Sequence, residues 1–177
     1  MKNRKITISF DVYKCVQILA ILYVVFLVVC VAFSFRGSLP DMFHRRNYNY
    51  WNRTEGFPNV RLIPFETIFG DLKELYRSSV RFGFFGRLLC YVPTGILIPV
   101  LLSPYRYHPL RAFSKTFFFS CILIVCIETI QYFSFFGVFN VDDIILGMIG
   151  TLFGYIIYLI GKRCVKRFFN VSDERSA

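Results

Sequence analysis

Four long apolar stretches constrain this chain more than any other feature. They lie near residues 15–35, 82–102, 117–136 and 143–161. A helix needs about 20 residues to cross the hydrocarbon core of a bilayer, and each stretch is long enough to do so. The sequence therefore predicts an all-α polytopic membrane protein with four transmembrane helices.

The composition agrees with this prediction. Of the 177 residues, 55% are apolar and 18% are charged, and a soluble domain usually carries more charge. No part of the chain is long and polar enough to form a separate globular domain. We predict a cytoplasmic amino-terminal segment 1–14, a membrane domain 15–161 that includes an outer loop 36–81, and a basic cytoplasmic tail 162–177.

The basic residues are distributed unevenly around the apolar stretches. Twelve of them precede the first stretch, link the second to the third, or follow the fourth: Lys2, Arg4, Lys5, Lys14, Arg106, Arg111, Lys115, Lys162, Arg163, Lys166, Arg167 and Arg175. With four crossings they share one side of the membrane, which the positive-inside rule makes cytoplasmic. We therefore expect a multi-pass protein of the cell membrane with both termini inside, and no binding of nucleic acid.

The long outer loop is predicted to have two different parts. Segment 36–58 is rich in turn-forming residues, and its Tyr48, Tyr50 and Trp51 suit the headgroup region of a membrane. From Phe65 onward, apolar residues recur at the spacing of a helix, at positions 65, 68, 69, 72, 75, 76 and 80. This pattern indicates an amphipathic helix, which either lies in the outer interface or packs on the transmembrane bundle.

Three of the predicted membrane helices carry polar residues that hydrocarbon disfavours. Arg87 lies in the second helix, Glu128 and Gln131 share one face of the third, and Asp142 and Asp143 begin the fourth. With four crossings all of them fall in the outer half of the membrane, where Arg87 is expected to pair with Glu128 or Asp143. They predict one polar pocket that opens outward. Two alternatives remain, a buried pair that only sets the helix register and an Asp142 that caps its own helix.

Three glycines follow the aspartates on the fourth predicted helix. Gly147, Gly150 and Gly154 lie on one stripe, and the segment "GTLFG" matches the G-x-x-x-G pattern. Such stripes let neighbouring helices approach closely, so these glycines are predicted to be packing residues.

Motifs of known catalytic and metal sites do not accompany the polar residues. The sequence shows no H-E-x-x-H motif and no glycine-rich phosphate loop, and its six cysteines form no C-x-x-C pair. We expect no catalytic residue, no metal and no cofactor. The alternative is a membrane enzyme with Glu128 as general base and with Asp142 and Asp143 as metal or substrate ligands.

The segments that carry these residues resemble, in order and spacing, the VanZ-like family of small bacterial membrane proteins. They are "NVRLIPFETI" (59–68), "RLLCYVPTGILIPVL" (87–101), "SCILIVCIETIQYF" (120–133) and "FNVDDIILGMIGTLFGY" (139–155). The resemblance spans roughly residues 15–161. It implies a link to resistance against glycopeptides such as teicoplanin, and it adds four motif residues to the expected pocket, Arg61, Pro64, Pro93 and Gly95.

The chain departs from the usual pattern of that family at four positions. Arg87 and Gly147 stand where the family usually has Asn, Val138 stands where it often has Arg, and Asn140 where it often has Asp. We hypothesise that Arg87 supplies the positive charge that is missing at position 138. A misfolded Arg87→Asn/Val138→Arg double variant would count against this hypothesis.

Functions of two classes fit these observations. The first is a non-catalytic envelope protein whose pocket binds a lipid headgroup or a lipid-linked cell-wall precursor, or modulates the access of a lipophilic glycopeptide to it. The second is an enzyme acting on a lipid or cell-wall intermediate through Glu128. A purely structural helix bundle is a third reading. Membrane lipids are the expected partners, and the oligomeric state is left open.

Overall fold

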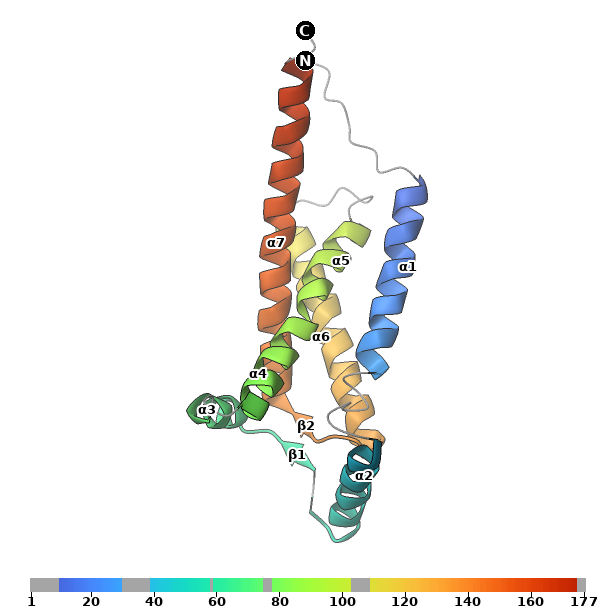
Figure 1. Cartoon of the computed structure of the whole chain (residues 1–177), viewed down its shortest axis with the longest axis vertical. Coiled ribbons are helices and arrows are strands. Elements are labelled where there is room, and N and C mark those ends of the chain that lie inside the picture. Colours follow the sequence, from blue (N-terminus) through green and yellow to red (C-terminus); the bar gives the residue numbers. More distant parts are fainter. Residues whose placement is uncertain (1–9, 30–38, 58, 75–77, 103–108, 175–177) are drawn as a thin grey trace.

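A computed structural model of the protein describes the chain except residues 1–9, 30–38, 58, 75–77, 103–108 and 175–177. Its elements in chain order are α1 (Phe10–Leu27), α2 (Leu39–Thr54), β1 (Val60–Arg61), α3 (Glu66–Lys73), α4 (Ser78–Cys90), α5 (Val92–Leu102), α6 (Pro109–Phe133), β2 (Phe139–Asn140) and α7 (Val141–Glu174). The long helices run along one axis, and α2, α3 and both strands gather at one end (Figure 1). The beginning of α1 and the carboxyl end of α7 lie at the opposite end.

Three helical segments of the described chain are long and apolar enough to cross a bilayer. They are Phe84–Leu102, Arg111–Phe133 and Val141–Cys164. The protein is thus an all-α membrane protein with three candidate spans among the described residues. The first predicted stretch forms a shorter apolar helix, Tyr13–Leu27, and its last part falls on residues outside those described. Four crossings therefore stay a prediction.

The second predicted helix is in fact two helices, α4 and α5, which meet at Tyr91. Pro93 lacks the N–H that a continuous helix would need, but it fits the first turn of a new one. The Tyr91 N–H donates to the Leu88 carbonyl at 3.3 Å, and the Thr94 hydroxyl donates to the Tyr91 carbonyl. The break thus keeps its backbone groups hydrogen-bonded.

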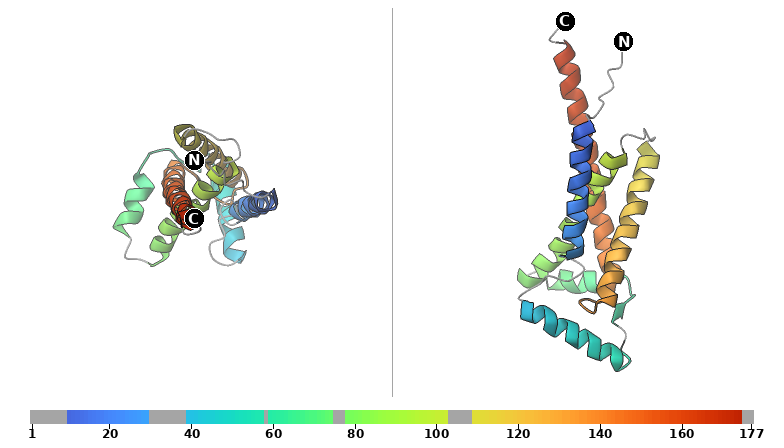
Figure 2. Two further views of the ribbon diagram at one scale, coloured as in Figure 1. Left: turned by 90° about the horizontal axis from the view of Figure 1, so that it is seen from above. Right: turned by 90° about the vertical axis from the view of Figure 1, so that its right-hand side faces the viewer.

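Helix α7 is the centre of the bundle. It packs mainly against α5 and also against α6 and α4, while α1 packs against α5 from the outside (Figure 2). The Tyr13 hydroxyl donates to the Leu101 carbonyl at 3.3 Å, and the Tyr23 hydroxyl donates to the Cys90 carbonyl. The first bond joins the beginning of α1 to the end of α5, and the second joins the later part of α1 to the residue just before the helix break, so α1 and α5 run antiparallel.

Helices α5 and α7 cross at very short range because both carry glycines there. A Cβ on Gly154 would overlap the Val92 carbonyl oxygen, and one on Gly95 would overlap the Thr151 carbonyl oxygen. The hydroxyls of Thr94 and Thr151 lie 3.0 Å apart at the same crossing. Gly95, which the family resemblance assigned to the pocket, is therefore a residue of the helix crossing in this structure.

Replacement of Gly154 tests this crossing. We expect Gly154→Ala to lower the free energy of unfolding by about 1–3 kcal/mol, since α7 must move away from α5. Gly161→Ala on the same helix is the matched control, because nothing lies within 4 Å of its added Cβ. Thermal unfolding of the purified variants in detergent measures the difference. Equal stability of the two variants would contradict the close crossing.

The outer loop differs most from its prediction. Segment 36–58 was expected to be turn-rich, but it contains helix α2, which lies across the end of the bundle (Figure 2). Tertiary contacts hold this helix against the turn after α6. The Asn49 side chain donates to the Phe135 carbonyl at 2.9 Å, and Arg53 donates to the Tyr132 carbonyl at 3.0 Å. The Arg53 guanidinium also lies 3.6 Å from the centre of the Tyr132 ring.

The predicted amphipathic helix is present as α3, and it ends at Lys73. It contacts α4 and α7, yet Phe65, Phe69 and Leu72 remain exposed. An exposed apolar face at this end of the spans suits the membrane interface. The contacts show that α3 packs on the bundle, and its placement in the membrane interface stays a prediction.

A two-stranded parallel sheet joins the outer loop to the segment before α7. Val60 pairs with Phe139, and Arg61 pairs with Asn140. Strands of two residues leave no periodic pattern in a sequence, so this small addition to the all-α fold was not predicted. The pairing places the beginning of α3 beside the beginning of α7.

Candidate functional site

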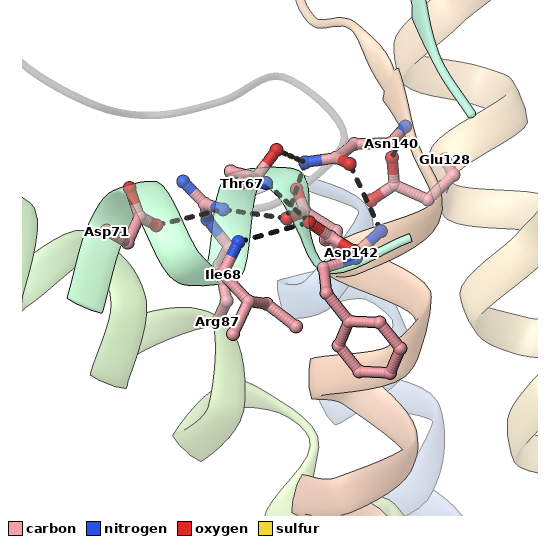
Figure 3. A network of polar contacts seen from close by, with 9 residues as sticks. Thr67, Ile68, Asp71, Arg87, Glu128, Asn140 and Asp142 are labelled. Atoms are coloured by element: carbon pink, nitrogen blue, oxygen red, sulfur yellow. Dashed lines mark hydrogen bonds and ion pairs between the residues drawn. The ribbon is translucent and has the colours of Figure 1, made fainter. Parts of the chain in front are cut away.

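Asp142 is the most deeply buried acid of the polar cluster, and it caps α3 instead of its own helix. Its carboxylate accepts hydrogen bonds from the backbone N–H groups of Phe65 at 2.6 Å, Thr67 at 2.7 Å and Ile68 at 3.1 Å (Figure 3). The first N–H groups of a helix have no partner within the helix, and a carboxylate there is favourable. Phe65 is the N-cap residue of α3, and its hydrocarbon side chain has no oxygen that could accept these hydrogen bonds.

Asn140 connects the acidic residues of the cluster to one another. Its side-chain oxygen accepts the Asp142 N–H at 3.1 Å, and its side-chain nitrogen donates to Asp143 at 3.2 Å and to Thr67 at 3.3 Å. Its backbone N–H donates to the Glu128 carboxylate at 3.3 Å. The pairing of β2 with β1 holds this residue in place, so the small sheet positions the whole cluster.

Arg87 lies between two aspartates of the cluster. Its guanidinium donates to the Asp143 carboxylate at 2.8 Å and lies 3.6 Å from that of Asp71. Asp143 is one of the two partners expected for Arg87. The side chains of this pair are only 16% and 19% exposed, so their attraction is weakly screened by solvent. The positive charge of Arg87 is therefore balanced within the protein.

Glu128 and Gln131 lie on the side of the cluster that faces the bundle interior. They are 1% and 8% exposed. Helix α6 ends at Phe133, earlier than predicted, which places Glu128 about 7–8 Å from the end of the helix. The Tyr91 hydroxyl is buried nearby, finds no hydrogen-bond partner among the described residues and interacts electrostatically with Glu128 and Asp143. The result is a buried polar layer just inside the end of the spans.

The remaining expected pocket residues border this cluster or lie away from it. Arg61, at the end of β1, pairs through its backbone with Asn140, and Pro64 precedes Phe65, but both side chains are exposed. Pro93 is the second residue of α5, beside the helix break. The glycines that were predicted as packing residues lie at helix contacts: Gly147 faces Ile124 and Tyr91, and Gly150 lies against the Leu88 carbonyl.

Three residues of the cluster were not singled out as site residues from the sequence, namely Thr67, Asp71 and Asn140. The first two belong to the amphipathic helix, where polar residues are ordinary. Asn140 lies two residues before the acidic pair, and it stands where the resembling family often has Asp; these two signals could have identified it.

The two adjacent aspartates do not act together. Asp142 faces α3 and Asp143 faces Arg87. Among the described residues, no group of three or more His, Cys, Asp or Glu side chains could hold a metal ion. The arrangement accordingly joins α3, α4, α6 and α7 through polar contacts.

A separate cavity of about 530 Å³ lies outside the ends of the spans, under α2. It is lined by Tyr48, Asn49, Asn52, Phe57, Asn59, Val60, Arg61 and Val138. Val138 is thus part of a different surface from Arg87, and the charge-exchange hypothesis for these two positions stays untested.

Comparison with known proteins identifies the family. A family model described as VanZ/LLP1 matches residues 20–162, which is most of the chain. No curated protein and no solved structure matches the chain. The matched region includes the first two candidate spans and all but the last two residues of the third. It also includes the outer loop and the polar cluster. The chain belongs to the VanZ/LLP1 family.

Proposed function

We propose that this protein is a non-catalytic envelope protein that binds a lipid headgroup or a lipid-linked envelope component at the outer surface of the cell membrane. We place both termini in the cytoplasm, because the basic residues Lys162, Arg163, Lys166 and Arg167 belong to the last part of α7, at the end opposite α2 and α3. The namesake activity of VanZ-like proteins adds a link to teicoplanin-type glycopeptide resistance.

One observation carries this proposal. Buried polar side chains collect at one end of the spans, where Glu128, Gln131, Asn140 and Asp142 are each at most 8% exposed. Polar groups at membrane depth are costly, and they commonly mark a pathway or a binding site. The loop segments that cover this end also expose aromatic residues, including Trp51 and Phe57. Such side chains suit contact with lipid headgroups.

The charges of the cluster restrict how a ligand is held. Arg87 faces Asp71 and Asp143, and Asp142 and Glu128 lie in the same network. One guanidinium among four carboxyl groups has no spare positive charge for a phosphate. We therefore propose that the loop segments contact the polar headgroup of the ligand. The polar cluster holds the helices and the loop in place at this end of the spans.

A purely structural cluster is the second candidate, and the capping of α3 by Asp142 favours it. Substitution of Glu128 distinguishes the two functions. Cells expressing wild-type protein are compared with Glu128→Gln and with the exposed control Glu55→Gln, at matched membrane levels. We expect wild-type protein and Glu55→Gln to raise the teicoplanin concentration needed for inhibition with little effect on vancomycin, and Glu128→Gln to lose this selectivity.

Loss of selectivity must occur in a folded protein to support the proposal. The unfolding temperature of each purified variant is measured for this purpose. Loss of protection that accompanies lower stability alone would favour the structural candidate. Turnover of a labelled lipid by the wild-type protein, abolished in a stable Glu128→Gln variant, would favour the enzyme.

A further inference from the structure

We propose that the cavity under α2 is a binding site for an uncharged saccharide, the sugar headgroup of a membrane-anchored glycolipid. This inference deepens the proposed function, on which it rests for the lipid anchor. Its volume of about 530 Å³ lies in the usual range of small-molecule sites, about 300–1,000 Å³.

The hydrogen-bonding groups of the cavity favour a ligand that donates hydrogen bonds. Asn49 and Asn59 are 8% and 9% exposed, and both line the cavity. Their side-chain N–H groups donate to backbone carbonyls, that of Asn49 to Phe135 at 2.9 Å and that of Asn59 to Asn49 at 2.7 Å. Among the described residues, no group donates to either amide oxygen. Neither oxygen is among the buried side-chain atoms that lack a partner, so both are open to solvent at the cavity wall. They can accept hydrogen bonds from a ligand, and the hydroxyl groups of a sugar are suitable donors.

The charge of the cavity excludes most other donors. Among the described residues that line it, none is acidic and Arg61 is charged. An amine or another cation would meet a guanidinium and no carboxylate, which is unfavourable. A phosphodiester headgroup would satisfy Arg61, but its phosphate carries no O–H group to donate to the two amide oxygens. A neutral polyol satisfies both requirements.

The apolar part of the cavity suits the faces of sugar rings. Tyr48 and Phe57 line it and are 65% and 63% exposed. Aromatic rings supply large contact areas at little conformational cost, while a few placed polar groups orient the ligand. Asn52, half-buried on the same wall, adds a third amide.

The position of the cavity suits a headgroup that is still attached to a lipid. Val138 in its lining lies three residues before Val141, where the last candidate span begins. The Phe135 carbonyl that holds Asn49 lies two residues after Phe133, where the preceding span ends. The cavity is therefore within a few residues of the membrane surface, at the level of the headgroups.

Fluorescence of Trp51 offers a local test. It is the single tryptophan of the chain, and it precedes Asn52 on α2. The full-length protein in lipid nanodiscs is titrated with three neutral sugars, chitobiose, maltose and lactose, and with inorganic phosphate, and saturation-transfer NMR reports binding independently. We expect at least one neutral sugar to bind and phosphate not to compete with it.

Two asparagines on the same helix provide the matched variants. Asn52→Ala removes a cavity amide and is expected to weaken sugar binding about 2- to 10-fold, the effect of one hydrogen bond. Asn47→Ala changes an exposed residue outside the lining and is expected to bind like wild-type protein. If Asn52→Ala does not fold, Phe57→Ala on the exposed loop serves instead and is expected to weaken binding similarly.

Three results would overturn the proposal. They are the absence of binding by all three sugars, competition by phosphate, and equal weakening by Asn52→Ala and Asn47→Ala. None of them removes the proposed function, which depends on teicoplanin selectivity and on Glu128. Conversely, sugar binding without any teicoplanin protection would leave the cavity assigned and would reject the antibiotic link.

Discussion

Arg87→Gln is expected to lower the free energy of unfolding by about 3 kcal/mol, because it leaves the carboxylates of Asp71 and Asp143 side by side without their cation. Breaking a buried ion pair usually costs about 3–5 kcal/mol, and the partial exposure of this pair places it at the lower end. Unfolding in mixed detergent micelles, followed by circular dichroism, measures the loss.

A double-mutant cycle separates the ion pair from other effects of the substitution. Asp143→Asn in the Arg87→Gln background removes one of the unbalanced charges, so we expect the double variant to be more stable than Arg87→Gln alone. Arg61→Gln is the control, since Arg61 is exposed and surface substitutions usually stay within about 0.5 kcal/mol of wild-type stability. A stability of Arg87→Gln equal to that of the control would show that the pair contributes nothing.

Asp142→Ala is expected to release the beginning of α3 from α7. Three backbone N–H groups of Phe65, Thr67 and Ile68 lose their acceptor at once. The loss of a helix cap costs about 0.5–2 kcal/mol and each buried unpaired donor about 1–3 kcal/mol, so we expect a total of about 2–3 kcal/mol after local rearrangement. Hydrogen exchange at Thr67 and Ile68 should accelerate at least about tenfold, which corresponds to about 1.4 kcal/mol of local stability.

Two other substitutions sharpen this prediction. Asp142→Asn keeps one acceptor oxygen, so it should fall between wild-type protein and Asp142→Ala. Asp41→Ala removes an exposed acid from the first turn of α2 and should leave exchange in α3 unchanged. Unaltered exchange at Thr67 and Ile68 in Asp142→Ala would refute the capping role.

Much of the candidate site could be recognised in the sequence, because polar side chains interrupt apolar segments there. Arg87, Glu128, Gln131, Asp142 and Asp143 stood out because charged and amide side chains are disfavoured in apolar helices. Their common placement at one end followed from the alternating direction of successive helices. The cavity under α2 had no such signal, because asparagines and aromatic residues are ordinary in an outer loop.

The interpretation of α2 shows why the loop was harder to predict than the spans. Its sequence is polar and rich in Asn and Tyr, residues of only moderate helix propensity. The contacts of Asn49 and Arg53 with the turn after α6 stabilise it instead. Contacts of this kind depend on residues far away in the chain, which a local pattern does not contain.

The sequence by itself determined the membrane class, the position of the apolar helices and the polar residues that interrupt them, because the bilayer acts directly on local length and composition. Only the tertiary structure decided which groups these residues meet. Asp142 caps α3 and Asp143 pairs with Arg87, although the two acids are neighbours in the chain. Adjacent side chains at the beginning of a helix point in different directions, so their partners depend on which elements the fold brings to each side.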